Sequence, residues 1–404
     1  MTDSMTEPSS LLLGNIGRLF TGDGDVIERA CVLVEHGLIA FAGPEAELPA
    51  SAVPPGTAEV DLEGRLVTPG LVDAHAHPVY GGDRFEEIAL RSSGASYPEI
   101  TARGGGIASS VSATRAARPE ALEGRVEGLL RAWLDSGTTT LEAKTGYLLD
   151  EQGELGCVRL LARCASAPHV PSVEITFLAA HAVPAEYAGR ADSYVEAVAS
   201  WCPAAREAGA RHVDVFCDEG YFTLEQSRAV LEAGIAAGLV PRIHADELAR
   251  TGGARLGAEL GCASADHLLK VDESDAVALA AAGVVATLAP VTALAMGTSP
   301  PLRLLRRAGV TIALGSDHNP GTCGTTSMPL VVALAVSELG MSVSEALVAA
   351  TAGGAASLRR HDRGRVAAGL RADLVAWAAG HEGAFAWSYG LEPDSVYVAG
   401  VRVR

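Results

Sequence analysis

Lysine is nearly absent from this chain of 404 residues. Arginine supplies 29 of the 31 basic side chains, and the two lysines are Lys144 and Lys270. Aromatic residues make up only 5%, so a buried core has to be built mainly from alanine, valine and leucine. The formal net charge is −18 and no basic stripe offsets it, which speaks against nucleic acid or an anionic membrane as a partner. A small anionic substrate is still compatible, because one well-placed arginine outweighs a distant average charge.

Closely spaced cysteine pairs are lacking too. The seven cysteines are odd in number and include no Cys-x-x-Cys, so neither a disulfide framework nor a zinc ribbon fits. Free thiols are typical of a reducing compartment, and we expect a cytoplasmic protein. Residues 1–10 lack the charged-then-apolar layout of a signal peptide. The uncharged stretch 276–301 is long enough to span a membrane, but glycine and proline interrupt it, so we expect no membrane segment.

Short apolar, β-branched runs alternate with helical stretches rich in alanine, leucine, glutamate and arginine over residues 68–316. Such alternation indicates βα units and a parallel sheet. Eight strands are predicted, at 71–74, 138–143, 172–179, 212–216, 240–243, 263–266, 284–288 and 311–315. Eight strands close a (β/α)8 TIM-like barrel, and a doubly wound open sheet is the alternative.

Both ends of the chain differ from this pattern and contain short strand-like segments, at 11–13, 31–35, 38–42, 373–377 and 396–403. Neither end is large enough to form a core alone, so we predict that they combine into one small β-sandwich domain. The expected division is 1–66 for the N-terminal part of this β domain, 67–362 for the barrel and 363–404 for the C-terminal part.

Two histidines, His75 and His77, follow the first predicted strand at a spacing of two residues. Residues i and i+2 of an extended segment point to the same face, so two imidazoles placed this way can share one cation. An isolated pair of this kind can equally be a solvated loop. Three more ligand-type residues follow the fifth, sixth and eighth predicted strands: His244, His267 and Asp317. The C-terminal ends of barrel strands meet at one mouth, which would bring these side chains together.

Nitrogen ligands with a carboxylate suit zinc or iron and are poor for Mg²⁺ or Ca²⁺, so we predict one metal ion, Zn²⁺ or Fe²⁺/Fe³⁺. An ion with an open position lowers the pKa of a bound water, and a nearby base then moves the proton. Glu247, three residues after His244, can reach the same cavity as that base. His267 either polarises the water or completes the ligand set, and a helix N-cap is the structural alternative for Asp317.

Lys144 raises a separate option. A compact ammonium and a planar guanidinium are not interchangeable, so a lysine kept in an arginine-rich chain is there for its chemistry or by chance. In some barrel hydrolases a carbamylated lysine on the fourth strand bridges two metal ions. Lys144 follows the second predicted strand instead, so we expect a single ion.

Several motifs of the chain resemble the amidohydrolase superfamily and, within it, the imidazolonepropionase family of histidine degradation. The superfamily-level motifs are Thr68-Pro69-Gly70-Leu71-Val72-Asp73-Ala74-His75-Ala76-His77 and Gly369-Leu370-Arg371-Ala372-Asp373-Leu374-Val375. The more specific motifs span residues 80–84, 104–107, 114–117, 142–147, 180–184, 213–217, 244–247, 264–267 and 317–322. The resemblance therefore covers almost the whole chain.

Carried over position by position, the resemblance implies three groups of site residues. The metal ligands would be His75, His77, His244 and Asp317. Water activation and proton transfer would fall to Glu247 and His267, with Asp317 as a further catalytic residue. The substrate contacts would be Arg84, Tyr147, His181 and Glu247, with Asn319, Gly321 and Thr322 near the product.

The resemblance also implies a reaction, the metal-dependent hydrolysis of the cyclic amide bond of 4-imidazolone-5-propanoate to N-formimidoyl-L-glutamate. Arg84 could hold the carboxylate of this small-molecule substrate through two parallel hydrogen bonds. His181 could donate to the ring carbonyl as the tetrahedral oxyanion forms. We further expect a homodimer.

Two other functions fit parts of the pattern. A deaminase or a hydrolase of a related heterocycle would use the same His-x-x-Glu motif, but Arg84, Tyr147 and the turn Asn319-Pro320-Gly321 favour opening of the cyclic amide. A catalytically silent scaffold would tend to lose ligands, whereas all five metal-site candidates are present.

The chain departs from the family pattern at three places. Leu148 stands where glycine is usual, and His318 where an apolar residue is usual. The usual Leu-Pro-Gly turn after the seventh strand reads Leu288-Ala289-Pro290-Val291. We expect these positions to line or adjoin the pocket.

Overall fold

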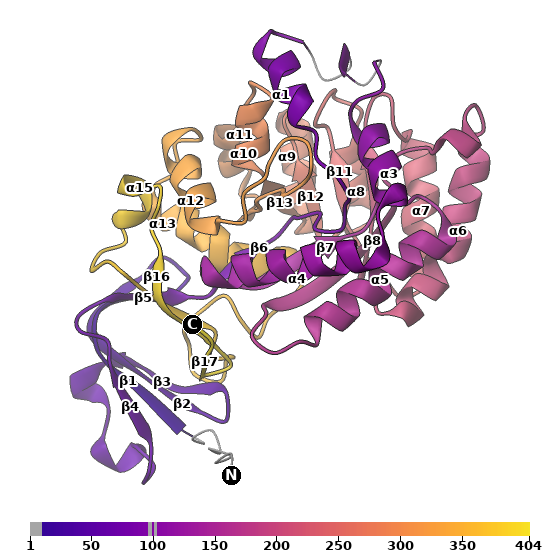
Figure 1. The fold of residues 1–404 in the computed structure, drawn as a ribbon. Coiled ribbons are helices and arrows are strands. Elements are labelled where there is room, and N and C mark those ends of the chain that lie inside the picture. Colours follow the sequence, from indigo (N-terminus) through magenta and orange to yellow (C-terminus); the bar gives the residue numbers. More distant parts are fainter. Residues whose placement is uncertain (1–9, 96–98, 101–102) are drawn as a thin grey trace, which may run out of the picture.

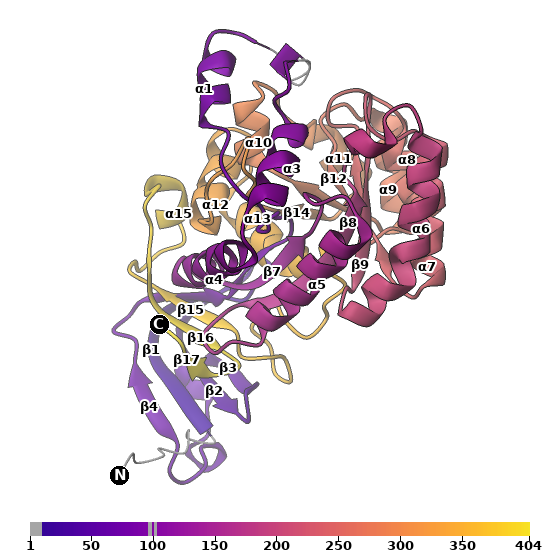
Figure 2. The ribbon, with the colours of Figure 1, turned by 45° about the vertical axis from the view of Figure 1, so that its right-hand side comes forward.

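A computed structural model describes residues 10–95, 99–100 and 103–404 of the protein. Helices surround a ring of parallel strands, and a small sheet built from both ends of the chain lies against one end of that ring (Figures 1 and 2). The predicted TIM-like barrel with a small β domain is thereby confirmed. Residues 1–9, where no signal peptide is predicted, lie outside the described residues.

The barrel strands follow one another in chain order around the ring. They are β6 (Leu71–Asp73), β7 (Thr138–Lys144), β8 (Ser172–Ala180), β9 (His212–Cys217), β10 and β11 (Val240–Pro241 and Ile243–Ala245), β12 (Ser264–His267), β13 (Val285–Leu288) and β14 (Ile312–Leu314). The first and last strands meet, because the N–H of Ala74 donates to the carbonyl of Leu314 (3.3 Å) and that of Asp317 donates to the carbonyl of His75 (2.8 Å). The open-sheet alternative is therefore wrong.

All eight predicted strands are confirmed to within two residues at each end, but the fifth differs in form. It is divided into β10 and β11 by Arg242, whose buried side chain donates to the carbonyl oxygens of Ala74 (2.9 Å) and Ser357 (2.6 Å). The second piece continues to Ala245, so His244 lies within a strand rather than after one.

Helices cover the outside of the barrel and line its rims (Figure 1). They are α1 (Phe85–Ser92), α3 (Ile107–Ala116), α4 (Pro119–Asp135), α5 (Glu151–Ala165), α6 (Ala191–Ala208), α7 (Leu224–Ala236), α8 (Gly253–Glu259), α9 (Glu273–Ala282), α10 (Pro290–Ala295), α11 (Leu302–Ala308), α12 (Met328–Ser337), α13 (Val343–Val348), α14 (Gly354–Ser357) and α15 (Ala384–Trp387). Local sequence sets several of their ends: Thr223, Asp272 and Ser342 each form a reciprocal capping box.

The uncharged stretch 276–301 contains the end of α9, strand β13 and helix α10. Among the residues that the structure describes, no helix is both long and apolar enough to cross a membrane. All seven cysteines are free, as the sequence predicted, and all of them are buried.

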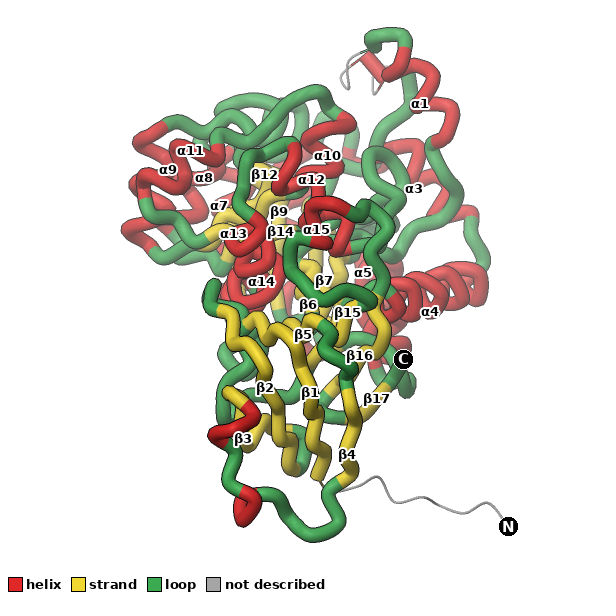
Figure 3. Tube along the Cα trace, turned by 90° about the vertical axis from the view of Figure 1, so that its left-hand side faces the viewer, coloured by secondary structure: helices red, strands yellow, loops and turns green. Residues whose placement is uncertain are grey.

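One sheet joins the two ends of the chain (Figure 3). It contains β1 (Ser10–Phe20), β2 (Val26–Glu35), β3 (Leu38–Pro44), β4 (Ala58–Asp61) and β5 (Leu66–Pro69) from the N-terminal part, and β15 (Leu374–Trp377), β16 (Pro393–Val398) and β17 (Val401–Arg402) from the C-terminal part. The N- and C-terminal parts meet where β5 pairs with β15. Because β5 runs through Gly70 into β6, the sheet is tied directly to the first barrel strand; the division 1–66, 67–362 and 363–404 stays a prediction.

Trp377 fixes the junction between this sheet and the barrel. Its buried indole N–H donates to the hydroxyl of Thr68 (2.9 Å), and its ring packs edge-on against Phe385 at 4.7 Å. A Cβ at Gly137, which precedes β7 and has φ of +90°, would lie 2.8 Å from the indole. The glycine thus permits both the left-handed turn and the close approach of the ring.

We predict that Trp377→Ala lowers the free energy of unfolding by about 3–5 kcal/mol, because it removes a large buried side chain at the junction. Trp387→Ala is the matched control, since this second tryptophan is 87% exposed and its loss should change the free energy by less than about 0.5 kcal/mol. Denaturant unfolding measures both, and equal losses would contradict the assigned role of Trp377.

Candidate metal centre and active site

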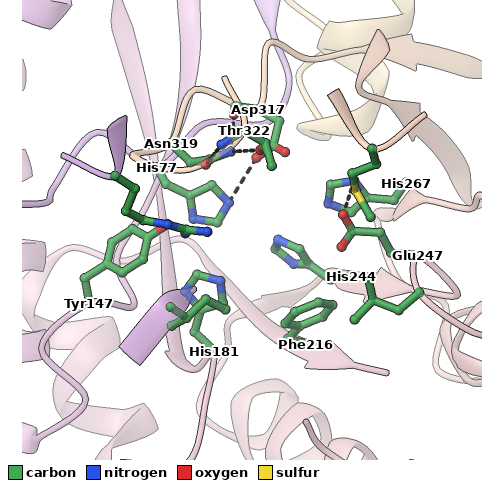
Figure 4. Close-up of a pocket in the computed structure, with 14 residues that line it drawn as sticks. His77, Tyr147, His181, Phe216, His244, Glu247, His267, Asp317, Asn319 and Thr322 are labelled. Carbon is green, nitrogen blue, oxygen red and sulfur yellow. Dashed lines mark hydrogen bonds and ion pairs between the residues drawn. The ribbon is translucent and has the colours of Figure 1, made fainter. Parts of the chain in front are cut away.

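Four predicted metal ligands meet at the C-terminal end of the barrel, and Figure 4 shows three of them, His77, His244 and Asp317. The Nε2 atoms of His75 and His77 are 3.1 Å apart, and Oδ1 of Asp317 lies 3.5 Å from each of them. His244 supplies a third nitrogen, and one ligand atom from each of the three histidines lies within 4.8 Å of the others. The spacing of two between His75 and His77 therefore does place both rings on one centre.

Buried carboxylates set the orientation of two of these rings. Nδ1 of His75 lies 2.7 Å from Oδ2 of Asp266, and Nδ1 of His244 lies 3.0 Å from Oδ2 of Asp214. An ionised carboxylate only accepts, so each Nδ1 carries the proton and each Nε2 keeps its lone pair for a metal ion.

The remaining chemistry of these residues also fits a metal ion. Burial holds the pKa of His75 and of His77 well below the ordinary value, so both imidazoles are neutral and able to act as ligands. Two neutral Nε2 atoms only 3.1 Å apart are best satisfied by a shared cation. Three imidazoles and one carboxylate are a donor set suited to zinc or iron.

A network of buried charges lies directly beneath the centre. The ammonium of Lys144 contacts Glu142 (2.8 Å), Asp214 (2.7 Å) and Asp266 (3.4 Å), and the guanidinium of Arg242 contacts Glu142 (2.8 Å) and Asp266 (3.5 Å). All five side chains are fully buried. A carbamate on Lys144 would place a further negative charge beside three carboxylates, which argues against the carbamylated lysine considered from the sequence.

Glu247 and His267 lie together on the other side of the cavity, where Nδ1 of His267 is 3.7 Å from Oε1 of Glu247 (Figure 4). Burial, then the nearby Asp317 and Asp218, raise the pKa of Glu247 well above its usual range. Burial and the adjacent His244 lower the pKa of His267 to about 3. His267 is not a member of the three-histidine group found among the described residues, and it pairs with the carboxylate instead.

The loop that carries Glu247 is held by Asp218, which follows β9. Oδ2 of Asp218 accepts from the N–H groups of Glu247 (2.7 Å) and Leu248 (2.8 Å), while Oδ1 accepts from those of Ala249 (3.0 Å) and Glu219 (2.7 Å). A single buried carboxylate thus ties the loops after the fourth and fifth strand positions to each other.

Strained backbone gathers at this rim. Asp246, His267, Leu268 and Asp317 all have a positive φ, between +51° and +72°. Each such residue costs on the order of 1–3 kcal/mol, and residues of this kind cluster at functional sites.

A cavity opens beside the ligand centre. Its walls include ten of the predicted site residues: His77, Arg84, Tyr147, His181, His244, Glu247, His267, Asp317, Asn319 and Thr322. The other two predicted site residues, His75 and Gly321, are not among the residues that line it. Four apolar residues not predicted for the site complete the lining: Ile107, Phe216, Leu248 and Met296.

Arg84 is held from two sides. One terminal nitrogen donates to Glu87 at 2.8 Å, and a Cβ at Gly321 would lie 2.4 Å from the guanidinium carbon. Gly321 therefore acts by leaving room for the guanidinium. Asn319 orders the same turn, because its side chain accepts from the N–H groups of Gly321 (2.8 Å) and Thr322 (2.9 Å).

The hydrogen bonds of His181 differ from those expected. Its Nδ1 lies 3.0 Å from the carbonyl oxygen of Gly146, which can only accept, so Nδ1 carries the proton. Burial and the neighbouring His244 lower the pKa of His181 to about 3, so the ring is neutral. Its Nε2 is then an acceptor, and in this state His181 cannot donate to an oxyanion as the sequence reading supposed.

The departures from the family pattern lie outside the cavity. Leu148, Pro290 and His318 are not among the described residues that line it. His318 turns instead toward Tyr80: its Nδ1 donates to the carbonyl of Thr325 (3.2 Å), and its Nε2 accepts from the hydroxyl of Tyr80 (3.0 Å). None of the three lines the pocket, but Leu148 and His318 adjoin it next to the lining residues Tyr147 and Asp317, so the expectation that these positions line or adjoin the pocket is confirmed for those two.

Comparison with known proteins agrees with this architecture. Residues 66–403 match the amidohydrolase family. The chain is 47% identical over 376 residues to an imidazolonepropionase from Salinispora arenicola, covering 91% of this chain and 92% of that protein. It is 45% identical over 375 residues to one from Mycolicibacterium smegmatis, covering 91% and 90%.

Two solved structures share the fold at low sequence identity. Triazine hydrolase from Arthobacter aurescens gives a TM-score of 0.78 at 18% identity and covers 98% of this chain and 94% of its own. N-isopropylammelide isopropylaminohydrolase from Burkholderia multivorans gives 0.74 at 19% identity and covers 98% of each chain. From its sequence relatives and family match, the chain belongs to the amidohydrolase family and, within it, to the imidazolonepropionases.

Proposed function

We propose that this protein hydrolyses the cyclic amide bond of 4-imidazolone-5-propanoate, giving N-formimidoyl-L-glutamate, with one metal ion held by His75, His77, His244 and Asp317. The observation that carries the proposal is the meeting of these ligands with Glu247 and Arg84 around one cavity. The high identity to imidazolonepropionases over nine-tenths of the chain supports the choice of substrate.

Water activation and proton transfer involve the metal ligands, Glu247 and His267. A bound zinc or iron ion would supply Lewis acidity and lower the pKa of its water ligand. Glu247 has a raised pKa and lies beside His267, so it can take a proton from the attacking water and return it to the departing ring nitrogen. His267 orients the Glu247 carboxylate through the 3.7 Å contact.

Other residues that line the cavity, Arg84, His181 and Tyr147, orient the substrate. Arg84 holds the propanoate carboxylate, with Gly321 leaving space for the guanidinium and Glu87 fixing one end of it. The neutral His181 offers Nε2 as an acceptor to a ring N–H, and Tyr147 packs beside it at 5.1 Å between ring centroids. Asn319 and Thr322 keep the adjoining turn in place.

Zinc or iron as the bound ion, a homodimeric assembly and a cytoplasmic location are further parts of this proposal. The three-imidazole, one-carboxylate donor set supports either metal. Elemental analysis of the purified protein distinguishes zinc from iron, and sedimentation analysis measures the oligomeric state.

Metal-replete protein should convert 4-imidazolone-5-propanoate to N-formimidoyl-L-glutamate without releasing ammonia. Chelation should abolish this conversion, and added Zn²⁺ or Fe²⁺ should restore it, because the bound ion activates the water. Substrate absorbance, product analysis and an ammonia assay follow the reaction. Stoichiometric ammonia would identify a deaminase, and full activity after exhaustive chelation would remove the metal from the reaction.

Glu247→Gln should lower kcat by about 10²- to 10⁴-fold while the metal content stays at the wild-type value, since the amide keeps the shape of the side chain but cannot accept the proton. Glu219→Gln, at an exposed carboxylate beyond the same barrel rim, is the control and should behave like wild type. Steady-state kinetics and metal analysis of both variants make the comparison. Near-normal turnover of the Glu247 variant would exclude it as the base.

Arg84→Ala should raise KM by about 10- to 100-fold, because a charge-assisted hydrogen bond contributes about 1.5–3 kcal/mol. Gly321→Ala should shift KM in the same direction, since the new Cβ would displace the guanidinium. An analogue without the carboxylate tests whether the change in KM comes from lost binding of that group, because its KM should change little in either variant. If the KM of both variants rises as much for that analogue as for the substrate, Arg84 has a structural role only.

A further inference from the structure

Lys144 is the last residue of β7 and is fully buried beneath the proposed metal centre. Its ammonium meets three carboxylates: Glu142 on the same strand at 2.8 Å, Asp214 on β9 at 2.7 Å and Asp266 on β12 at 3.4 Å. An ammonium carries three N–H donors that can point in three directions, whereas a guanidinium directs its donors within one plane. Contacts in three directions therefore favour a lysine over an arginine at this position, in a chain that has only one other lysine.

Two of these carboxylates are the ones that orient the ligand histidines. Oδ2 of Asp214 lies 2.7 Å from the ammonium and 3.0 Å from Nδ1 of His244. Oδ2 of Asp266 lies 3.4 Å from the ammonium and 2.7 Å from Nδ1 of His75. One cation thus reaches the same two oxygen atoms that set both imidazole rings.

We propose that Lys144 is a positioning residue of the metal centre, which holds Asp214 and Asp266 so that they aim His244 and His75 at the ion. The inference rests on the metal site of the proposed function and adds to it a residue that touches neither metal nor substrate. In the described part of the chain, the Asp214 carboxylate pairs within 4.0 Å with the ammonium of Lys144 and with His244, the ligand that it orients. Without Lys144, Asp214 would be a buried carboxylate that has no permanently charged cation within this distance among the described residues.

The charge state of the network agrees with this role. Burial acts to lower the pKa of Lys144, but Asp214, Glu142 and Asp266 raise it overall, so the side chain is an ammonium.

The test measures zinc affinity of the metal-stripped protein by competition with a chromophoric chelator. Lys144→Met keeps the length of the side chain and removes its charge, and it should weaken zinc binding by about 10- to 100-fold, as loss of a group behind a metal ligand typically does. Lys270→Met is the matched control at the other lysine, which is exposed, and its affinity should stay within about twofold of wild type.

A second variant separates positioning from folding. Lys144→Met/Glu142→Gln removes one buried cation together with a carboxylate whose ion pairs within 4.0 Å, among the described residues, are with Lys144 and Arg242, so the charge balance is kept and Asp214 and Asp266 are left intact. It should fold, as followed by circular dichroism, and still bind zinc at least tenfold more weakly than wild type. The Co²⁺-loaded double variant should also show altered d–d absorption, which reports the geometry of the ligands directly.

A double-mutant cycle tests whether Lys144 acts on the metal centre through Asp214. Asp214→Asn should weaken zinc binding by itself, and Lys144→Met should cost less affinity in that background than in wild type, because the two residues act through the same contact. Wild-type affinity and an unchanged Co²⁺ spectrum in the folded double variant would overturn the proposal. So would full additivity in the cycle, or failure of both Lys144 variants to fold, since Lys144 would then serve the fold alone. Wild-type protein that binds no metal would instead refute the proposed function.

Discussion

The structure depends on a set of ionic contacts inside the barrel, between Lys144 and Arg242 on one hand and Glu142, Asp214 and Asp266 on the other. Barrels of this class usually fill their interior with branched aliphatic side chains. A buried ion costs several kcal/mol unless it is paired and hydrogen-bonded, so this arrangement is costly for stability. With two cations and three carboxylates the set is one positive charge short, and a metal ion above it fits that deficit. Stability and metal binding are therefore linked in the same side chains.

The rim above this network is rigid for local reasons. Asp317 accepts from the hydroxyl of Thr292 at 2.6 Å, and Asp218 gathers four N–H groups from the loops around Glu247. The first of these contacts fixes the side chain of Asp317, whose backbone has a positive φ. The ligands are thus aimed from below by carboxylates on strands, and the base is held from the side by a carboxylate on a loop. The two supports share no residue, so substitutions in them should affect metal binding and proton transfer separately.

The barrel could be predicted from the sequence because its strands are short, apolar and regularly spaced. The metal ligands could be predicted because they lie at the C-terminal ends of those strands. It could not place the charged network, since which carboxylates face inward depends on the tilt and closure of the ring. The motif residues Glu142, Asp214 and Asp266 were visible, but only the fold shows that they meet at Lys144. The donor direction of His181 was also beyond sequence, because it follows from the carbonyl of Gly146. The rarity of lysine was the one signal that pointed to the network, and it could not be told from chance.

The distribution of charge explains how a chain of net charge −18 can bind an anionic substrate. The cavity wall carries a single type of strong donor for a carboxylate, the guanidinium of Arg84, while the nearby imidazoles of His77 and His181 are neutral. On the far side, Glu247 and Asp317 repel each other strongly enough to contribute to the raised pKa of Glu247. In the proposed complex, a propanoate bound at Arg84 would lie away from these two carboxylates, and the ring carbonyl would lie between the ligand histidines and Glu247. The proposed orientation of the substrate therefore depends on the separation of Arg84 from Glu247 and Asp317.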